Sequence, residues 1–360
     1  MIKIGLIIYG SLDTISGGYL YDRKLVEYLR QQGDTVEIIS LPWRNYAAHL
    51  TDNLLFRLPR DFDLIIEDEL NHPSLIAANQ GKHLYPVVSL VHHLRCSESR
   101  PKWQKLFYRW IEKRFLDSVD GFIFNSKTTK GATSRLVGND KPSVIAYPPT
   151  DRFGEAISEN EIIERANGKE LKILFLGNVI ERKGLHVLLE ALARVGRDSI
   201  SSYKLDVVGS SISEPKYAQA IQEKVEVLGL TSTVFFHGAL DNQPLIEMYT
   251  QSHLMVVPSS YEGFGIVYLE GMGFGLPAIG TTAGAAGEII THGDDGYLIQ
   301  PEDTNALTGY IHELASNREL LLKLSLNAVK RYKVQPKWEE TAKFIREFLY
   351  KMARRSLVVE

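Results

Sequence analysis

Two glutamates, Glu262 and Glu270, stand eight positions apart in a glycine-rich segment that follows a short apolar run. The residues directly after the first glutamate are Gly263, Phe264 and Gly265. Glycines let backbone N–H groups approach a ligand closely, and the N-terminus of a helix beginning near 264 attracts a phosphate. Eight positions are about two helical turns, so we expect both carboxylates on one side. The pattern indicates one carboxylate for a sugar and the other for a ribose.

A second group of polar residues lies on the loop after the apolar run 171–176. The run ends at Gly177, a helix is expected to start near Gly184, and Arg182 and Lys183 lie between them. Cationic side chains in this place put positive charge where a diphosphate would bind. For Arg182, a solvated loop charge is the alternative.

The N-terminal half offers two weaker candidates, each after an apolar run. Gly17 and Gly18 precede an expected helix, so backbone amides there can receive a phosphate or a sugar hydroxyl. His92 and His93 follow the run 87–91, and a histidine at the carboxyl end of a strand is well placed for a ligand crevice. A satisfied structural histidine is the alternative, and the sequence does not say which of the two faces the crevice.

These loops belong to a regular alternation of apolar runs and helical stretches. Continuous runs rich in Val, Ile and Leu are typical of parallel strands that helices cover on both faces. In the first half the runs are 2–8, 36–41, 63–66, 87–91 and 121–124. In the second half they are 171–176, 204–208, 233–236, 254–257, 276–279 and 297–299. The pattern predicts an α/β protein with two doubly wound, Rossmann-like domains.

A change in composition marks the boundary between these domains. We predict an N-terminal domain over 1–150, a polar linker over 151–170 and a C-terminal domain over 171–336. The remainder, 337–360, predicts an amphipathic helix, and its periodicity leaves open whether it packs back on the first domain. Ligands bind beyond the carboxyl ends of the strands in such domains, so facing domains would enclose the site in an interdomain crevice.

The composition excludes several classes of protein. The chain has 360 residues, of which 44% are hydrophobic and 24% charged, and a net charge of −3. This balance is typical of a soluble globular protein and does not indicate a nucleic-acid partner. The single cysteine, Cys96, excludes an internal disulfide and fits a cytoplasmic protein. No apolar stretch reaches the roughly 18 residues of a membrane-spanning helix, so any membrane contact is expected to be peripheral.

The stretch 100–115, RPKWQKLFYRWIEKRF, interleaves Lys and Arg with Trp, Phe and Tyr. Such a helix can lie on an anionic membrane surface, with the protein on the inner face of a membrane. An ordinary packed helix with a basic outer face is the alternative, and the sequence leaves both open.

The segment 258–288 resembles the signature of the family 4 retaining glycosyltransferases, which have the GT-B fold and belong to glycosyl transferase group 1. The shared pattern is a Glu, seven residues and a second Glu, followed by a G-x-P turn and a later turn, GAAGE. The resemblance spans nearly the whole chain and is strongest over 171–303. It implies that Glu262 and the amides of 263–265 contact the donor sugar, and that Glu270 holds the ribose hydroxyls.

The same resemblance extends to the other basic and glycine residues. Lys183 matches the lysine of the family's Lys-Gly segment, whereas Asn178 stands where many members have an arginine. We infer that Arg182 replaces that arginine as a phosphate ligand. The family's counterparts of Gly17 and Gly18 border the donor phosphates and the acceptor.

The resemblance also bears on the histidines. His92 matches a histidine that contacts the donor sugar near the reacting centre, and His93 stands where aspartate is common. Asn125 and Ser126 lie where the family often has a small polar residue near the site; a helix N-cap is the alternative.

The resemblance implies a metal-independent transferase that moves a hexosyl group from a nucleoside-diphosphate sugar with retention of configuration. UDP or GDP donors are favoured, no cofactor is expected, and the acceptor is a glycan, lipid-linked or small-molecule hydroxyl, as in polysaccharide or glycolipid biosynthesis. A sugar-nucleotide epimerase and a catalytically silent donor-binding protein are the alternatives on this architecture. A dinucleotide oxidoreductase is not favoured, because no G-x-G-x-x-G follows the first strand.

Overall fold

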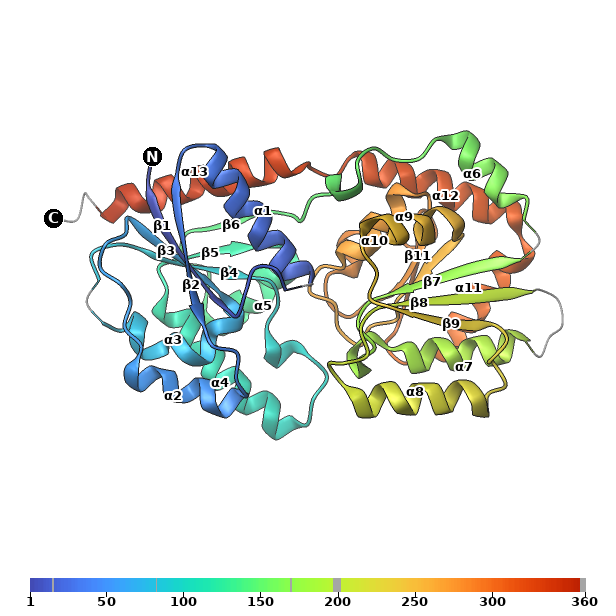
Figure 1. Cartoon of the computed structure of the whole chain (residues 1–360), viewed down its shortest axis with the longest axis horizontal. Helices are drawn as coiled ribbons and strands as arrows, with labels where there is room; N and C mark the ends of the chain where they lie inside the picture. The colour runs from blue at the N-terminus through green and yellow to red at the C-terminus, as the bar shows by residue number, and fades with distance from the viewer. Residues whose placement is uncertain (15, 82, 169, 197–201, 357–360) are drawn as a thin grey trace. The chain divides into compact units, whose positions relative to one another are not determined.

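The computed structural model describes residues 1–14, 16–81, 83–168, 170–196 and 202–356. The chain divides into two compact units. Unit 1 consists of Met1–Pro149 and Pro336–Glu360, and unit 2 consists of Thr150–Gln335. Each unit contains one parallel six-stranded sheet with helices on both faces (Figure 1). Among the described residues, no helix is long and apolar enough to cross a membrane.

The sheet of unit 1 has the strand order β2-β1-β3-β4-β5-β6. Its strands are β1 (Lys3–Tyr9), β2 (Thr35–Leu41), β3 (Leu64–Asp68), β4 (Val87–Val91), β5 (Gly121–Phe124) and β6 (Ser143–Ile145). Ile4 of β1 lies opposite Val36 on one side and opposite Leu64 on the other. The first five strands coincide with predicted apolar runs. The sequence pattern did not reveal β6, because this edge strand has only three residues and all are partly exposed.

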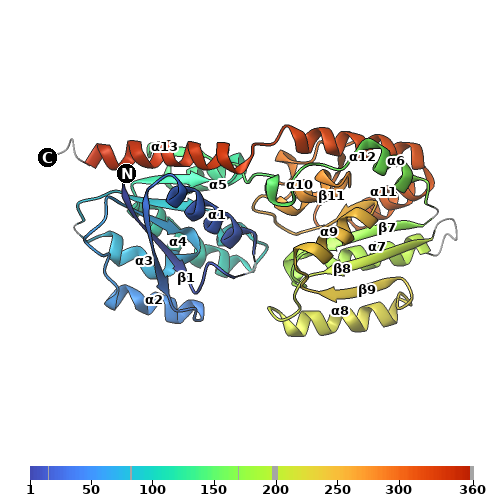
Figure 2. The same ribbon diagram turned by 45° about the horizontal axis from the view of Figure 1, so that its top comes forward.

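Helices cover both faces of this sheet with separate apolar cores. Side chains of α1 (Gly17–Gln31) and α13 (Trp338–Ser356) pack into one core. The other core receives side chains of α2 (Tyr46–Leu55), α3 (His72–Asn79), α4 (Lys102–Ser118) and α5 (Lys127–Val137). Figures 1 and 2 show α1 and α13 on the side of the sheet away from α2 and α3.

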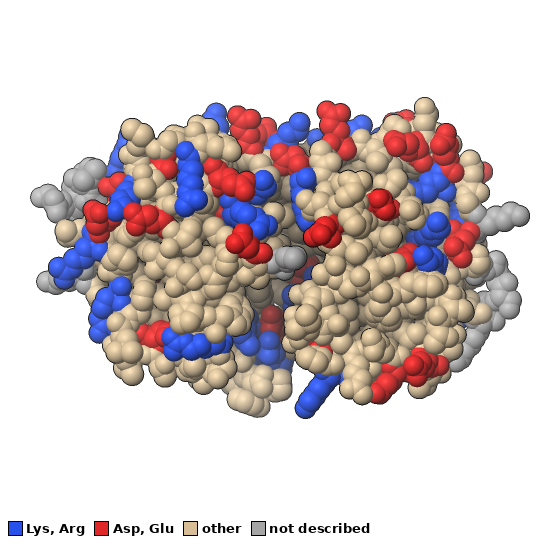
Figure 3. All heavy atoms as spheres, viewed as in Figure 1, with Lys and Arg blue, Asp and Glu red and all other residues tan. Residues whose placement is uncertain are grey.

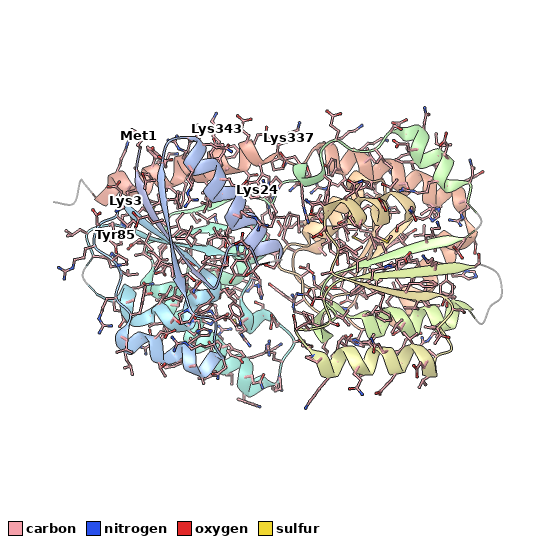
Figure 4. The ribbon with its side chains drawn as sticks, in the orientation of Figure 1. Met1, Lys3, Lys24, Tyr85, Lys337 and Lys343 are labelled. Atoms are coloured by element: carbon pink, nitrogen blue, oxygen red, sulfur yellow. The ribbon has the colours of Figure 1, made fainter. Side chains whose placement is uncertain are left out.

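The C-terminal helix α13 belongs to unit 1, although it follows the whole of unit 2 in the sequence. Ala342, Ile345 and Leu349 are fully buried on the face that the periodicity predicts. The exposed residue Lys343 lies on the opposite, outer side of the helix, and the exposed residue Lys337 directly precedes it (Figure 4). The helix therefore completes the core of the N-terminal sheet.

The sheet of unit 2 has the strand order β12-β11-β10-β7-β8-β9. Its strands are β7 (Leu171–Leu176), β8 (Tyr203–Val208), β9 (Val234–Gly238), β10 (Leu254–Val256), β11 (Ala278–Thr281) and β12 (Gly296–Ile299). Its helices are α6 (Glu159–Ala166), α7 (Leu185–Val195), α8 (Pro215–Val227), α9 (Asn242–Gln251), α10 (Ile266–Gly273), α11 (Thr304–Ser316) and α12 (Arg318–Lys333). Figure 1 shows α7 and α8 on one side of the sheet and α9 and α10 on the other.

The segment 151–170, for which the sequence predicts a linker, is folded as part of unit 2. It contains the 3-10 helix η3 (Asp151–Phe153) and the helix α6. Ser158 and Glu161 form a capping box at the start of α6, and Ile162 is buried. The polar composition of this stretch reflects the outer face of a short helix that packs beside α12.

Candidate functional site

The two candidate loops of unit 2 lie where its strand order reverses. β7 and β10 are neighbours, and the chain builds the sheet outward from β7 to β9 on one side and from β10 to β12 on the other. In doubly wound sheets the loops after such a strand pair diverge and form a ligand crevice. The loop after β7 carries the 3-10 helix η4 (Glu181–Lys183), and the loop after β10 carries Glu262.

Lys183 and Glu262 form an ion pair across these two loops. The Nζ atom of Lys183 lies 2.6 Å from Oε2 of Glu262, and the two side chains are 14% and 11% exposed. The hydroxyl of Ser259 donates to the same oxygen over 3.2 Å. Burial raises the pKa of the Glu262 carboxyl, but Lys183 and Arg182 outweigh burial and hold this pKa below its usual value. Glu262 is therefore a charged acceptor held against a lysine.

Hydrogen bonds to the backbone and one close backbone approach hold the two loops together. Nη1 of Arg182 donates to the carbonyl oxygen of Tyr261 over 2.8 Å, and the amide of Ser260 donates to the carbonyl oxygen of Arg182 over 2.8 Å. Gly184 has a φ of 71°, and a Cβ atom there would lie 2.2 Å from the carbonyl oxygen of Pro258. Only glycine permits this close approach. Arg182 thus holds the loop that carries Glu262, the ion-pair partner of Lys183.

A tight turn connects Glu262 to α10. The turn consists of Gly263, Phe264 and Gly265. Gly265 has a φ of 94°, in the left-handed region that favours glycine, and directly precedes the helix. Gly284 packs so closely on the loop that a Cβ atom there would lie 2.0 Å from the carbonyl oxygen of Glu262. The N-terminal end of α10, with its partial positive charge, therefore adjoins the Glu262 loop.

Glu270 has a different set of partners from Glu262. Its Oε1 accepts a hydrogen bond from Nη1 of Arg152 over 2.9 Å, and its Oε2 accepts one from the hydroxyl of Tyr249 over 2.8 Å. The Glu270 side chain is 1% exposed. Burial and the nearby carboxylate raise the pKa of Tyr249, so its hydroxyl remains a donor. Both carboxylate oxygens of Glu270 thus have a protein partner, and a ribose would have to share or replace these bonds.

In unit 1 the strand order reverses between β1 and β3. Helix α1 follows β1 and begins at Gly17, where the side chain of Ser16 accepts a hydrogen bond from the amide of Tyr19 over 3.2 Å. A Cβ atom on Gly18 would lie 3.4 Å from Cδ2 of His92. His92 and the first turn of α1 therefore meet at the carboxyl edge of this sheet.

His92 contacts acidic residues that the sequence analysis did not single out. Its Nε2 lies 3.1 Å from Oδ1 of Asp22, and its side chain is 16% exposed. Asp68, at the end of β3, completes a cluster of three residues, in which one carboxylate oxygen of each aspartate and a ring nitrogen of His92 lie within 4.8 Å of one another. Burial lowers the pKa of His92, but Asp22 and Asp68 outweigh burial and raise it to about 9. Burial, together with Asp22, raises the pKa of Asp68 to about 7. His92 is therefore a cation at neutral pH.

His93 binds elsewhere. Its Nε2 lies 3.2 Å from Oε1 of Glu98. Nδ2 of Asn125 donates to the carbonyl oxygen of His92 over 2.7 Å and so holds the backbone of this histidine. Ser126 is the N-cap of α5, which is the alternative predicted for it. Of the two histidines, His92 is the one that lies beside the predicted glycines.

Comparison with known proteins identifies the family of one unit. Residues 157–331 match the family model of glycosyl transferases group 1. Unit 2 contains a glycosyl transferases group 1 domain. The ion pair, the turn into α10 and Glu270 all lie within this domain.

Curated relatives resemble part of the chain. A D-inositol 3-phosphate glycosyltransferase of Rhodococcus opacus is 31% identical over 251 residues, which are 67% of this chain and 55% of the relative. The D-rhamnosyltransferase WbpZ of Pseudomonas aeruginosa is 31% identical over 233 residues, 63% of this chain and 58% of the relative. An uncharacterized 41.2 kDa protein from the cps region of Klebsiella pneumoniae is 27% identical over 231 residues, with coverages of 62% and 60%. The chain thus spans less than two thirds of each of these relatives.

Solved structures share the fold. A sucrose-phosphate synthase of Thermosynechococcus elongatus has a TM-score of 0.78 at 20% identity, and the match covers 99% of this chain and 100% of the other. Alr3699/HepE of Anabaena, in complex with UDP-glucose, has a TM-score of 0.75 at 19% identity, with coverages of 98% and 100%. Together with the two parallel sheets, these similarities establish the GT-B architecture.

Two groups of described residues have the spacing of metal ligands. They are Asp22, Asp68 and His92 in one case, and Glu69, His72 and Glu112 in the other. In the first group, Nε2 of His92 lies 3.1 Å from Oδ1 of Asp22. Nδ1 of His72 lies 2.9 Å from the carbonyl oxygen of Glu69, and Nε2 lies 2.9 Å from the hydroxyl of Tyr46. In both groups the histidine is thus held by partners within the protein.

The candidate sites of the two units both contain residues that pattern reasoning missed. Asp22 carries a weak signal, because it is a charged residue among the apolar positions that α1 buries. Asp68 stands at the end of an apolar run, as ligands in parallel sheets often do. Arg152 and Tyr249 carry no signal: the first lies in a stretch that the sequence assigns to a linker, and the second resembles an ordinary core aromatic. Only the fold of unit 2 places both on Glu270.

Proposed function

We propose that this chain is a family 4 glycosyltransferase that moves a hexosyl group from a nucleoside-diphosphate sugar to the hydroxyl of a glycan, lipid-linked or small-molecule acceptor, with retention and without a metal ion. The observation that carries the proposal is the Lys183–Glu262 ion pair beside the N-terminus of α10, inside a group 1 domain. The relatives named as D-inositol 3-phosphate glycosyltransferase and D-rhamnosyltransferase support this class of reaction. The Anabaena complex makes UDP-glucose the first donor to test, with GDP sugars next.

These residues are placed to stabilise the negative charge of the leaving group. When the bond between the sugar and the diphosphate breaks, negative charge develops on the departing phosphate. Lys183, the neighbouring Arg182 and the N-terminus of α10 supply fixed positive charge for that anion. Glu262, held ionised, accepts hydrogen bonds from sugar hydroxyls. The acceptor hydroxyl attacks on the face that the phosphate leaves and passes its proton to this phosphate, so Glu262 needs no role as a covalent nucleophile.

Ribose binding is assigned to Glu270. A carboxylate offers about four lone-pair sites, and Arg152 and Tyr249 use one on each oxygen. The remaining sites can accept the two ribose hydroxyls while the protein partners keep the carboxylate oriented. Glu270→Ala is therefore expected to weaken donor binding, whereas Lys183→Ala lowers turnover more than binding.

For His92, Gly17 and Gly18 we propose contact with the donor, as the family resemblance implies. A histidine with a pKa of about 9 is protonated at neutral pH, so His92 donates a hydrogen bond and does not act as a general base. Its role is to orient and stabilise the sugar.

Donor binding is tested first by thermal unfolding with UDP, GDP, ADP and NAD, each with and without EDTA, because selective binding raises the melting temperature. A rise with UDP or GDP that EDTA does not remove supports the proposal. Turnover of the matching sugar nucleotide is then followed, and the anomeric configuration of the product is read by NMR. Inversion, or a requirement for a divalent cation, contradicts the corresponding part of the proposal. Binding without turnover indicates a silent donor-binding protein, and donor isomerisation without an acceptor indicates an epimerase.

The role of the ion pair is separated from its effect on stability by a set of variants. Lys183→Met and Glu262→Gln each leave one buried charge without its partner, which costs about 3–5 kcal/mol of stability. The double variant removes both charges and is expected to fold better than either single variant while staying inactive. Lys224→Met is the matched control, because Lys224 pairs with Glu190 over 2.5 Å on the surface of the same unit. An active double variant would refute the assignment of this pair.

A further inference from the structure

Helix α4 presents two different faces. Its inner face buries Ile111, Glu112, Phe115 and Leu116. Its outer face leaves large apolar side chains in solvent: Trp103 is 69% exposed, Leu106 67%, Phe107 40% and Trp110 55%. Of the two alternatives that the sequence leaves open, a packed helix with a merely basic outer face does not describe this arrangement.

The exposed apolar residues form one continuous stripe. Their positions are i, i+3, i+4 and i+7, which place them on one side of a helix. Monomeric proteins rarely expose a contiguous group of large apolar side chains without an interaction to cover it. The stripe of Trp103, Leu106, Phe107 and Trp110 is called the aromatic stripe below.

Basic side chains flank the aromatic stripe. Lys102, Arg109, Lys113 and Arg114 are all exposed on α4. The guanidinium carbon of Arg114 lies 5.1 Å from the centre of the Trp110 ring, and Lys113 pairs with Asp117 over 2.8 Å. The other acidic residue of the helix, Glu112, is buried and accepts hydrogen bonds from the amides of Arg95 and Cys96. The outer face of α4 is therefore positive, although the chain as a whole has a net charge of −3.

This combination identifies the chemistry of the partner. Tryptophan side chains favour the boundary between hydrocarbon and water, and Lys and Arg extend from apolar surroundings toward anionic headgroups. The core of a protein interface, by contrast, is depleted in lysine. Trp103 and Trp110 are about 10 Å apart along the helix axis, which suits a helix lying in the plane of a bilayer surface. In Figure 3 the lower edge of unit 1, where α4 runs in Figure 1, carries uncharged side chains beside basic ones.

We propose that the aromatic stripe of α4 docks this protein on an anionic lipid bilayer, with Trp103 and Trp110 in the interfacial region and the flanking Lys and Arg at the headgroups. The inference rests on the exposure and charge of α4 and goes beyond the proposed glycosyl transfer. It applies whether or not the acceptor is a lipid.

The test is sedimentation of the full chain with vesicles of phosphatidylcholine alone and of phosphatidylcholine mixed with phosphatidylglycerol. We expect binding to the mixed vesicles only, weakened by salt. Trp103→Ser combined with Trp110→Ser is expected to reduce the partition coefficient at least about tenfold. Phe344→Ser is the matched control, since Phe344 is a 60% exposed aromatic residue on α13.

Charge is tested in the same assay. Lys102→Gln combined with Arg109→Gln should weaken binding about fivefold per residue. Lys337→Gln, directly before α13, combined with Lys343→Gln on this helix should leave binding unchanged (Figure 4). All substituted side chains are exposed, so circular dichroism and thermal unfolding should match the wild type. Absence of vesicle binding, or equal binding by the stripe variant and its control, overturns the proposal. A dimer that the tryptophan variant converts to a monomer, without vesicle binding, overturns it in favour of a second copy of the chain.

Discussion

Replacing Asp22 by asparagine is expected to lower the pKa of His92 from about 9 toward its ordinary value of 6.5. Asp22 is fully buried, and its Oδ1 lies 3.1 Å from Nε2 of the histidine. Asparagine keeps the shape of the side chain and removes its charge. The environment left behind is dominated by burial, which disfavours the imidazolium ion.

The magnitude follows from the two pKa values. The difference between 9 and 6.5 corresponds to about 3 kcal/mol of preferential stabilisation of the charged form. Because the folded-state pKa lies above the unfolded one, this stability is fully present below pH 6.5 and is lost as the pH rises through 9. The unfolding free energy of the wild type should therefore fall by up to about 3 kcal/mol across this window, and that of Asp22→Asn should fall much less. Asp68 and Glu67, with pKa values of about 7 and about 8, also titrate in this window, so the contribution of His92 is read as the difference between the wild type and Asp22→Asn.

The assay is NMR titration of the histidine ring signals, with parallel chemical denaturation at each pH. The chain has ten histidines, and His92→Gln identifies the signal by removing it. His93→Gln is the neighbouring control, because His93 pairs with Glu98 and not with Asp22. A wild-type His92 that titrates near 6.5, or a pKa that Asp22→Asn does not change, would refute the reasoning.

Two further predictions concern the framework of each unit. Gly184→Ala places a side chain on a residue in the left-handed region, which should lower the unfolding free energy by about 1–3 kcal/mol from backbone strain alone. The contact of the new Cβ atom with Pro258 adds to this loss. Gly229→Ala is the control in urea unfolding and should lower the unfolding free energy less, because Gly229 has a φ of 69° but no neighbour within 4 Å. Ile345→Ala should destabilise unit 1 by about 2–5 kcal/mol, because Ile345 is fully buried in its core, whereas Phe344→Ala, on the outer side of the same helix, should change the unfolding free energy by less than about 0.5 kcal/mol. Equal effects within either pair would contradict the structure.

Most strands and the loops that carry the candidate site could be predicted from local pattern. A parallel strand buried on both faces needs a continuous apolar run, as Leu171–Leu176 shows. Edge strand β6 could not be predicted in this way, because its three residues are partly exposed and form no such run. The linker prediction for 151–170 missed α6, since a short helix with one buried isoleucine looks polar in composition.

The turn glycines could likewise be recognised from the sequence, while their geometric reason appeared only in the structure. Gly265 and Gly284 both adopt positive φ angles at the Glu262 loop. Position 284 also requires glycine because the backbone of Glu262 occupies the space that a Cβ atom would fill. A local pattern shows that a glycine is present but not which neighbour demands it.

The sequence by itself determined the α/β class, the positions of most strands and the identity of the candidate residues, because apolar periodicity, glycine turns and strand ends are properties of neighbouring residues. Only the tertiary structure decided which side chains these candidate residues pair with. Glu262 lies 79 positions from Lys183, Arg152 lies 118 positions from Glu270, and Asp22 lies 70 positions from His92. The charge state of each residue depends on burial and on these distant partners, so no local pattern records it.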